Sequence, residues 1–232
     1  MNPTSLLVMK TLFRIYRPVV LWFAGILVIG AAIADAVITR FTEPEFSLWL
    51  LVSSTAPRYW LMVVGIILVT MQLRQYISNG VTRRDFLIGA GVFGLILAVL
   101  AALWVPLGHG VESALLGLDG QLPAGYPPFS FSVALREFGY MLPGAIAFLV
   151  AGVAISGGYY RYGLWGGSLA LLPCALPVVA TEAFLGIDGQ GHLSTRLVPY
   201  AVALAVSLAV TAVAAAVCHL ALRDAPIRRT AE

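Results

Sequence analysis

Charged side chains are scarce in this chain of 232 residues: only 11% are Asp, Glu, Lys or Arg, while 60% are hydrophobic and the mean hydropathy is +0.92. A soluble domain carries about 25% charged residues. So few charges cannot cover the surface that a folded chain of this length would expose to water. The composition excludes an ordinary soluble domain, a disordered chain and a nucleic-acid-binding protein, and it indicates that the main solvent is lipid.

Chemically reactive residues are equally few. Lys10 is the single lysine and no glycine precedes it, so the chain has no ATP site of the P-loop kind. The two cysteines fall within apolar stretches and predict neither a disulfide framework nor a metal site. The three histidines, His109, His192 and His219, are isolated in the sequence. We therefore expect no catalytic, cofactor-binding or metal-binding residues in this chain, and no enzymatic activity of its own.

Six apolar stretches are each about long enough to cross a bilayer as a helix, which takes about 20 residues. The alternating short strands of an outer-membrane barrel are absent. We therefore predict an all-α membrane protein with a single transmembrane domain over residues 1–232, folded as a six-transmembrane-helix bundle. The expected spans are residues 18–38, 60–77, 86–107, 135–156, 164–183 and 198–220.

The basic residues are distributed unevenly between the loops. With the N-terminus in the cytoplasm, ten of the 14 Lys and Arg residues lie on the inner side, and eight of the 11 acidic residues lie on the outer side. The positive-inside rule then predicts that both termini are cytoplasmic. The basic isoelectric point reflects this topology and contact with anionic lipid, not nucleic acid. We expect a multi-pass protein of the inner (plasma) membrane.

Residues 1–17 combine apolar residues near helical spacing with the basic side chains of Lys10, Arg14 and Arg17. This pattern predicts a short amphipathic helix that lies in the inner membrane interface. Two roles fit it equally well: an anchor that sets the topology, or a docking helix for a cytoplasmic partner.

Three prolines are candidate kinks along a transport path. Pro173 and Pro177 predict that the fifth span is kinked or broken, and Pro143 predicts a milder kink in the fourth. Broken helices often line transport paths because their exposed backbone needs protein or water nearby. The outer loops that would flank such a path are expected over residues 39–59 and 108–134.

Small residues recur along the sixth span in steps of four and three. They are Ala201, Ala205, Ala209, Ala212 and Ala216. Such a face permits close helix approach, and we expect it to pack within the chain rather than against another subunit.

The most informative segment is the inner loop Asn79-Gly80-Val81-Thr82-Arg83-Arg84-Asp85-Phe86. Asn79-Gly80 is a helix terminator and turn. Thr82 can cap the next helix, with Asp85 at the third helical position, where its carboxylate complements the helix dipole. The pattern predicts a sharp, charged and rigid elbow at the membrane surface.

This elbow resembles the Gly-x-Ser/Thr-Arg-Arg-x-Phe segment of ABC-2-type transporter permeases, and the six-span plan with its amphipathic N-terminal helix is similar to theirs. The resemblance implies the permease subunit of an ATP-driven transporter, more often an exporter, that works with a second identical or related permease subunit. Separate ATP-binding cassette subunits would hold ATP and Mg. The implied contacts with them are Gly80, Thr82, Arg83, Arg84, Asp85 and Phe86, helped by the N-terminal helix. Residues 181–197 depart from the family, which often has a longer helical re-entrant segment there.

Two other functions remain open. Ser156-Gly157 and His219 resemble parts of the serine and histidine pair of rhomboid-type intramembrane hydrolases, although the first glycine of that motif is missing. An ion-coupled carrier would need an ionisable group within the membrane. We expect Asp35 and Glu182 to be interfacial instead, since each lies near the outer end of its span.

Overall fold

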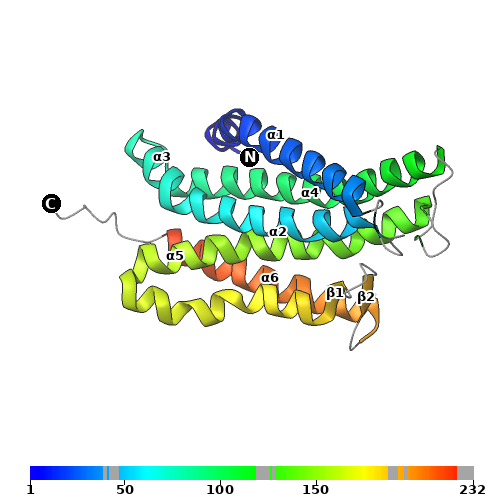
Figure 1. Cartoon of the computed structure of the whole chain (residues 1–232). Coiled ribbons are helices and arrows are strands. Elements are labelled where there is room, and N and C mark those ends of the chain that lie inside the picture. The colour runs from blue at the N-terminus through cyan, green and yellow to red at the C-terminus, as the bar shows by residue number, and fades with distance from the viewer. Residues whose placement is uncertain are drawn as a thin grey trace.

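The computed structural model describes residues 1–38, 41, 47–118, 126, 129–187, 193–195 and 198–223. These residues form a bundle of long helices with one small strand hairpin (Figure 1). Five of the helices are long and apolar enough to cross a membrane. The prediction of a helical, multi-pass membrane protein is confirmed at this level.

Helix α1 (Pro3–Ile38) joins the predicted interfacial segment to the predicted first span without a break. Figure 1 shows its first turns end-on and its later part running along the bundle. Pro18 lies inside α1 and gives a physical cause for this bend, because proline removes one backbone hydrogen bond. The two predicted parts therefore differ in direction but belong to one helix.

The next helical rod consists of α2 (Leu48–Ile67), a π-helical turn η1 (Leu68–Leu73) and α3 (Arg74–Ser78). The predicted outer loop over residues 39–59 is therefore wrong from residue 48 onward; residues 39, 40 and 42–46 lie outside the described part. Ser47 begins α2 by accepting a hydrogen bond from the backbone N–H of Leu50. Trp49 and Arg58 are buried, so this rod packs against the bundle over its outer turns as well.

Helix α4 (Arg83–Leu118) also extends further than expected. The predicted loop over residues 108–134 is wrong for residues 108–118, which continue the helix. The added turns are held because His109 is fully buried and Glu112 accepts several hydrogen bonds from other segments. Between α4 and the next helix, only residues 126, 129 and 130 are described.

Helix α5 (Phe131–Phe184) contains one residue outside helical geometry, Gly163, with φ 74° and ψ −166°. This residue divides α5 into two arms. Figure 1 shows the two arms running side by side in opposite directions. Close packing requires glycine in the returning arm: a Cβ on Gly167 would lie 2.4 Å from a ring atom of Tyr159. Pro173 and Pro177 lie within helix, so the chain breaks at Gly163 and not at the prolines.

The chain continues through β1 (Leu185–Ile187), β2 (Leu193–Thr195) and α6 (Tyr200–Arg223), and the two strands pair antiparallel. Helix α6 buries Ala203, Ser207 and Thr211. The alanine stripe lies on its exposed side. The expectation that this stripe packs within the chain is therefore wrong for the single chain.

The bundle has two ends, which we name by their turns. At the elbow end α3 meets α4, α5 bends at Gly163 and α6 ends at Arg223 (Figure 1). At the hairpin end α4 ends, α5 begins and β1 pairs with β2. Backbones approach closely between the ends: a Cβ on Gly152 of α5 would lie 2.1 Å from the carbonyl oxygen of Met62 of α2. The two ends are thus joined by a tightly packed middle.

Candidate functional site

The turn between α3 and α4 has the geometry that its sequence predicts. Gly80 has φ +82°, a left-handed conformation that glycine adopts without strain. The N–H of Gly80 donates to the carbonyl of Ile77, and the N–H of Val81 donates to the carbonyl of Tyr76 at 3.1 Å. This is the hydrogen-bond pattern of a Schellman motif, which closes the end of a helix. The elbow is therefore a hydrogen-bonded turn and not an irregular loop.

The start of α4 is held by a reciprocal cap. The backbone N–H of Asp85 donates to the Thr82 hydroxyl at 3.2 Å, and that hydroxyl donates to the Asp85 carboxylate at 2.7 Å. Asp85 stands at the third helical position and so complements the positive end of the helix dipole. The predicted roles of Thr82 and Asp85 in the turn are confirmed.

The N-terminal part of α1 packs directly on this elbow. The hydroxyl of Ser5 donates to the Asp85 carboxylate at 2.9 Å. Gly89 lets the two backbones meet, because a Cβ there would lie 2.6 Å from the carbonyl oxygen of Ser5 and 2.9 Å from Cβ of Val8. Val8 and Leu12 are fully buried beneath this contact. The sequence pattern did not single out Ser5, Val8 or Gly89.

The residues of the elbow differ in what they can offer to a partner. Phe86 is 1% exposed and packs against the Tyr76 ring with centroids 5.3 Å apart, so its side chain belongs to the core. Thr82 and Arg84 are exposed, and Arg83 is half-buried. The basic side chains of α1 are also exposed; they are Lys10, Arg14 and Arg17. The elbow and the first turns of α1 are thus in contact, and both carry exposed positive charge; we call the two together the elbow surface.

The hairpin end contains buried charged groups that the sequence did not reveal. Arg58 of α2 is paired with Glu182 of α5, with 2.5 Å between Nη1 and Oε1, and its other Nη lies 3.4 Å from the sulfur of Met141. The Arg58 side chain is 8% exposed. Gly144 leaves room for it, because a Cβ there would lie 3.2 Å from Nε. Two residues expected to lie separately on the outer side are therefore partners across the bundle.

A second buried pair lies beside the first. His109 Nδ1 of α4 and Glu137 Oε1 of α5 lie 2.7 Å apart, and the two side chains are 0% and 3% exposed. His109 Nε2 and the second carboxylate oxygen of Glu137 are buried without a hydrogen-bond partner. The interpretation of His109 as an isolated residue is wrong. Its partner lies 28 residues away on another helix, beyond the reach of any local pattern.

Glu112 organises the remaining polar groups of this end. One of its oxygens accepts the backbone N–H of Trp49 at 3.1 Å. The other accepts the hydroxyls of Ser47 and of Tyr126, the latter at 2.6 Å. Burial and the hydrogen bond to Glu112 raise the pKa of Tyr126 above its ordinary value, so the phenol remains a donor. The Tyr126 ring also contacts the ring of His109, which links Glu112 to the His109–Glu137 pair.

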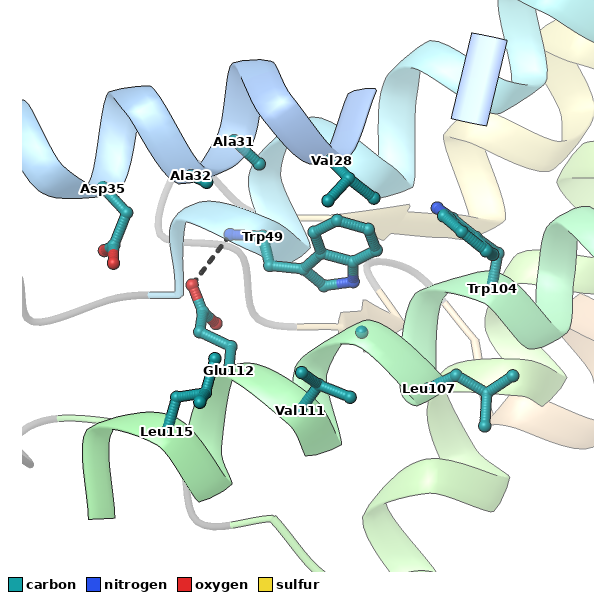
Figure 2. A pocket seen from close by; sticks show the side chains of 11 residues that line it. Val28, Ala31, Ala32, Asp35, Trp49, Trp104, Leu107, Val111, Glu112 and Leu115 are labelled. Atoms are coloured by element: carbon teal, nitrogen blue, oxygen red, sulfur yellow. Dashed lines mark hydrogen bonds between the residues drawn. The ribbon is translucent and has the colours of Figure 1, made fainter. Parts of the chain in front are cut away.

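A pocket of about 310 Å³ opens between α1 and α4 next to Glu112. Figure 2 shows Trp49 and Trp104 along its floor and the carboxylates of Asp35 and Glu112 at one end. The volume is at the lower end of the range, about 300–1,000 Å³, that small-molecule sites occupy. This pocket and the buried pairs make the hairpin end a second candidate site.

The five remaining sequence-based candidates are the three prolines of α5, Ser156 and His219. Pro143 and Pro177 are buried within α5, while Pro173 is exposed. The Ser156 hydroxyl donates to the carbonyl of Gly152 at 2.7 Å, within its own helix, while His219 of α6 is exposed. No hydrogen bond joins these last two among the described residues, so the arrangement does not support a hydrolase dyad.

In the described ranges, no group of three or more His, Cys, Asp or Glu side chains could hold a metal ion. His192 of the sequence lies outside those ranges. Comparison of the chain with models of protein families, with curated proteins and with solved structures finds no match.

Proposed function

We propose that this chain is the membrane-spanning permease subunit of an ATP-driven transporter, an exporter of the ABC-2 type, in the inner (plasma) membrane. The observation that carries the proposal is the elbow surface. A short rigid turn, capped at both of its helices, is joined by the Ser5–Asp85 hydrogen bond to a helix with three exposed basic residues. An anchoring helix alone needs no fixed contact with this turn, whereas a docking surface needs both parts held together.

Six membrane spans agree better than five with the lengths of the helices and the thickness of a bilayer. A straight helix of 54 residues would measure about 81 Å, far more than the hydrocarbon thickness of about 30 Å. Divided at Gly163, α5 supplies two arms, residues 131–162 and 164–184, each long enough to cross. Both termini are then cytoplasmic with the elbow end inside, which agrees with the basic residues Arg74, Arg161 and Arg223 at that end.

In this proposal the elbow transmits force into the bundle. An ATP-binding subunit that moves on ATP binding would push the elbow, and a rigid turn passes this displacement on to α2 and α4 as a unit. The π-helical turn η1 lies directly between α2 and α3. Such turns are weak points in a helical hydrogen-bond ladder and often occur at functional sites. We propose that the rod formed by α2, η1 and α3 bends at η1 when the elbow is displaced.

A second permease subunit would complete the path, and α6 offers a face for it. The alanine stripe is exposed along this helix. Small residues let membrane helices approach closely, and packing of that kind drives association in lipid.

The test is assembly with an ATP-binding cassette protein encoded beside the gene for this chain. We expect the two proteins to co-purify, and we expect Arg83→Glu with Arg84→Glu to abolish both co-purification and stimulation of ATP hydrolysis. Arg136→Glu is the matched control, since this arginine is exposed near the start of α5, at the other end of the bundle. Assembly that survives the double charge reversal would overturn the role of the elbow.

A specific observation favours one alternative, an ion-coupled carrier that works alone. The His109–Glu137 pair is an ionisable pair inside the bundle, with one unpaired polar atom on each side chain. Such groups occur in proton pathways. If the purified chain in liposomes moved a solute in response to a pH gradient without any ATPase, and Glu137→Gln abolished it, the carrier would replace the permease proposal.

A further inference from the structure

A pocket of about 360 Å³ lies between α4 and α6, with η1 and the first arm of α5 as its floor. Its walls are hydrocarbon: among the described residues that line it, only Cys218 and His219 carry polar side-chain atoms. Val69 and Leu149 on the floor are buried, whereas Leu95 on the α4 wall is 50% exposed. The pocket therefore opens sideways, toward the surface that the long apolar helices present to lipid.

Small residues on the two walls leave this space between the helices. Both walls are packed on the floor: a Cβ on Gly94 of α4 would lie 2.6 Å from the Leu149 side chain, and a Cβ on Gly157 of α5 would lie 3.3 Å from the side chain of Leu222 in α6. Gly91, one turn from the first of these contacts, lines the pocket, and a Cβ there would meet nothing within 4 Å. The pocket therefore has a fixed floor and room for an apolar group.

A lipid acyl chain matches the walls of this pocket. Apolar walls lose dispersion contacts when no atoms lie against them. Water is a poor filler, because a bound water needs two to four polar partners, and such atoms come here only from Cys218 and His219 among the described lining residues. In a bilayer, hydrocarbon chains surround the helices and can enter from the side. The lining thus favours a chain over a polar ligand.

Basic groups stand at the elbow end of this pocket. Arg84, Leu87, Gly91 and Leu95 follow one another in steps of three, four and four, so they share one face of α4. The last three line the pocket, and Arg84 is exposed one turn beyond them. Side chains of a helix tilt toward its N-terminus, and long basic side chains reach the headgroup region from such positions. The α4 wall therefore ends in a positive charge at the membrane surface.

A second guanidinium lies at the same end. Arg161, near the end of the first arm of α5, donates to the carbonyl of Ala221 at 2.5 Å. The next residue of α6, Leu222, lines the pocket, so this hydrogen bond holds the Arg161 charge beside it. His219 is exposed on the α6 wall and offers a further polar group. The pocket thus combines a hydrocarbon interior with positive charge at one end.

We propose that this pocket binds one acyl chain of an anionic phospholipid, from the leaflet at the elbow end, with its headgroup phosphate held by Arg84 and Arg161. Arginine suits this role because its guanidinium can donate two parallel hydrogen bonds to a phosphate. A zwitterionic lipid adds a positive charge next to its phosphate and is therefore bound less well. The proposal concerns binding by this chain alone and does not depend on the permease assignment.

The experiment uses the full chain in nanodiscs of phosphatidylcholine with a trace of phosphatidylglycerol that carries a photoreactive diazirine in one acyl chain. Mass spectrometry of peptides locates the crosslinks after illumination. We expect them at residues 87–95 and 215–222, and we expect added phosphatidylglycerol to suppress them while the same amount of phosphatidylcholine does not. Equal suppression by both lipids, or crosslinks spread evenly over the exposed turns of α1, would overturn the proposal.

One pair of variants tests the interior of the pocket. Gly91→Leu fills it, and we expect crosslinking at residues 215–222 to fall about fivefold or more, because the chain loses its contacts with the walls. Gly30→Leu is the matched control: Gly30 is exposed on α1, nothing lies within 4 Å of a Cβ there, and crosslinking should not change. Unchanged crosslinking in Gly91→Leu would show that the chain binds elsewhere.

A second pair tests the charge at the pocket end. Arg84→Gln should weaken the preference for phosphatidylglycerol over phosphatidylcholine about twofold to fivefold, since an exposed ion pair is lost. Arg14→Gln removes an exposed arginine from α1, on the same end of the bundle but away from the pocket, and should leave the preference unchanged. An equal loss in both variants would mean a general attraction to anionic lipid and would overturn the site.

A photoreactive amino acid in place of Leu95 identifies what occupies the pocket. A crosslink to phospholipid supports the proposal. A crosslink to residues 224–232, or to a second copy of the chain, in place of phospholipid overturns it. The ATP-binding subunit takes no part in these measurements, so their outcome is separate from that of the assembly test of the permease proposal.

Discussion

The two ends of this bundle use charge in opposite ways. At the elbow end, Arg84 and the basic residues of α1 are exposed, and the fold holds them through backbone turns and caps. At the hairpin end, Arg58, His109 and Glu137 are buried, and each is held by a partner on another helix. Exposed charges cost little folding free energy and remain free for a partner, whereas buried charges must be matched within the chain.

This difference predicts how substitutions at each end affect association and stability. A substitution on the elbow surface should alter association and leave the fold intact. A substitution among the buried pairs should alter the fold first.

The largest effect is expected at the His109–Glu137 pair. His109→Leu leaves the Glu137 carboxylate buried without a partner, which should lower the free energy of unfolding by about 3–5 kcal/mol. The combined variant His109→Leu with Glu137→Leu should recover most of this loss, because no buried charge remains. Thermal unfolding of the purified chain in detergent measures both. A double variant as unstable as the single one would contradict this account of the hairpin end.

An intermediate effect is expected where α1 meets the elbow. Gly89→Ala places a Cβ against the backbone of Ser5, so the first turns of α1 must move away, at a cost of about 1–3 kcal/mol. Trypsin should then cut faster at Lys10 and Arg14. Gly91→Ala is the control two residues along, where nothing lies within 4 Å, and it should stabilise the helix by up to about 1 kcal/mol. Equal digestion of the two variants would show that α1 is not held by this contact.

The smallest effect on stability is expected at Arg84. Its removal in Arg84→Ala should change the unfolding free energy by no more than about 0.5 kcal/mol, because the side chain is exposed. Arg58→Ala removes an arginine at the other end of the bundle and should lower the free energy of unfolding by about 1–3 kcal/mol. The loss is no larger because the partly exposed Glu182 remains partly solvated. If both variants melted alike, the contrast between exposed and buried charge would not hold.

Local signals in the sequence were sufficient for the elbow. Asn79-Gly80 and Thr82-x-x-Asp85 act over three or four residues through backbone hydrogen bonds, so their geometry could be predicted without any neighbour. The ends of the helices were harder to predict. Leu48–Tyr59 and Gly108–Leu118 contain Pro57, His109 and Glu112, which read as loop residues, yet contacts with other helices keep these turns helical. Tertiary packing outweighs such weak local preferences.

The alanine stripe of α6 also shows that tertiary contacts could not be predicted from the local sequence. Its spacing defines one face of a helix, but spacing alone does not say what that face contacts. Only the packed chain shows that the stripe is exposed and that Ala203, Ser207 and Thr211 form the buried side.

By itself, the sequence determined that lipid is the main solvent of this protein, that its structure is helical and that it has a sharp capped turn before residue 86, because these follow from composition and from interactions between near neighbours. Only the tertiary structure decided which charges are partners. Arg58 and Glu182 are 124 residues apart, and Asp35 and Glu112 meet at one pocket from two helices. Helix packing brings such residues together. The periodicity of residues along one helix does not indicate which residues of other helices it contacts.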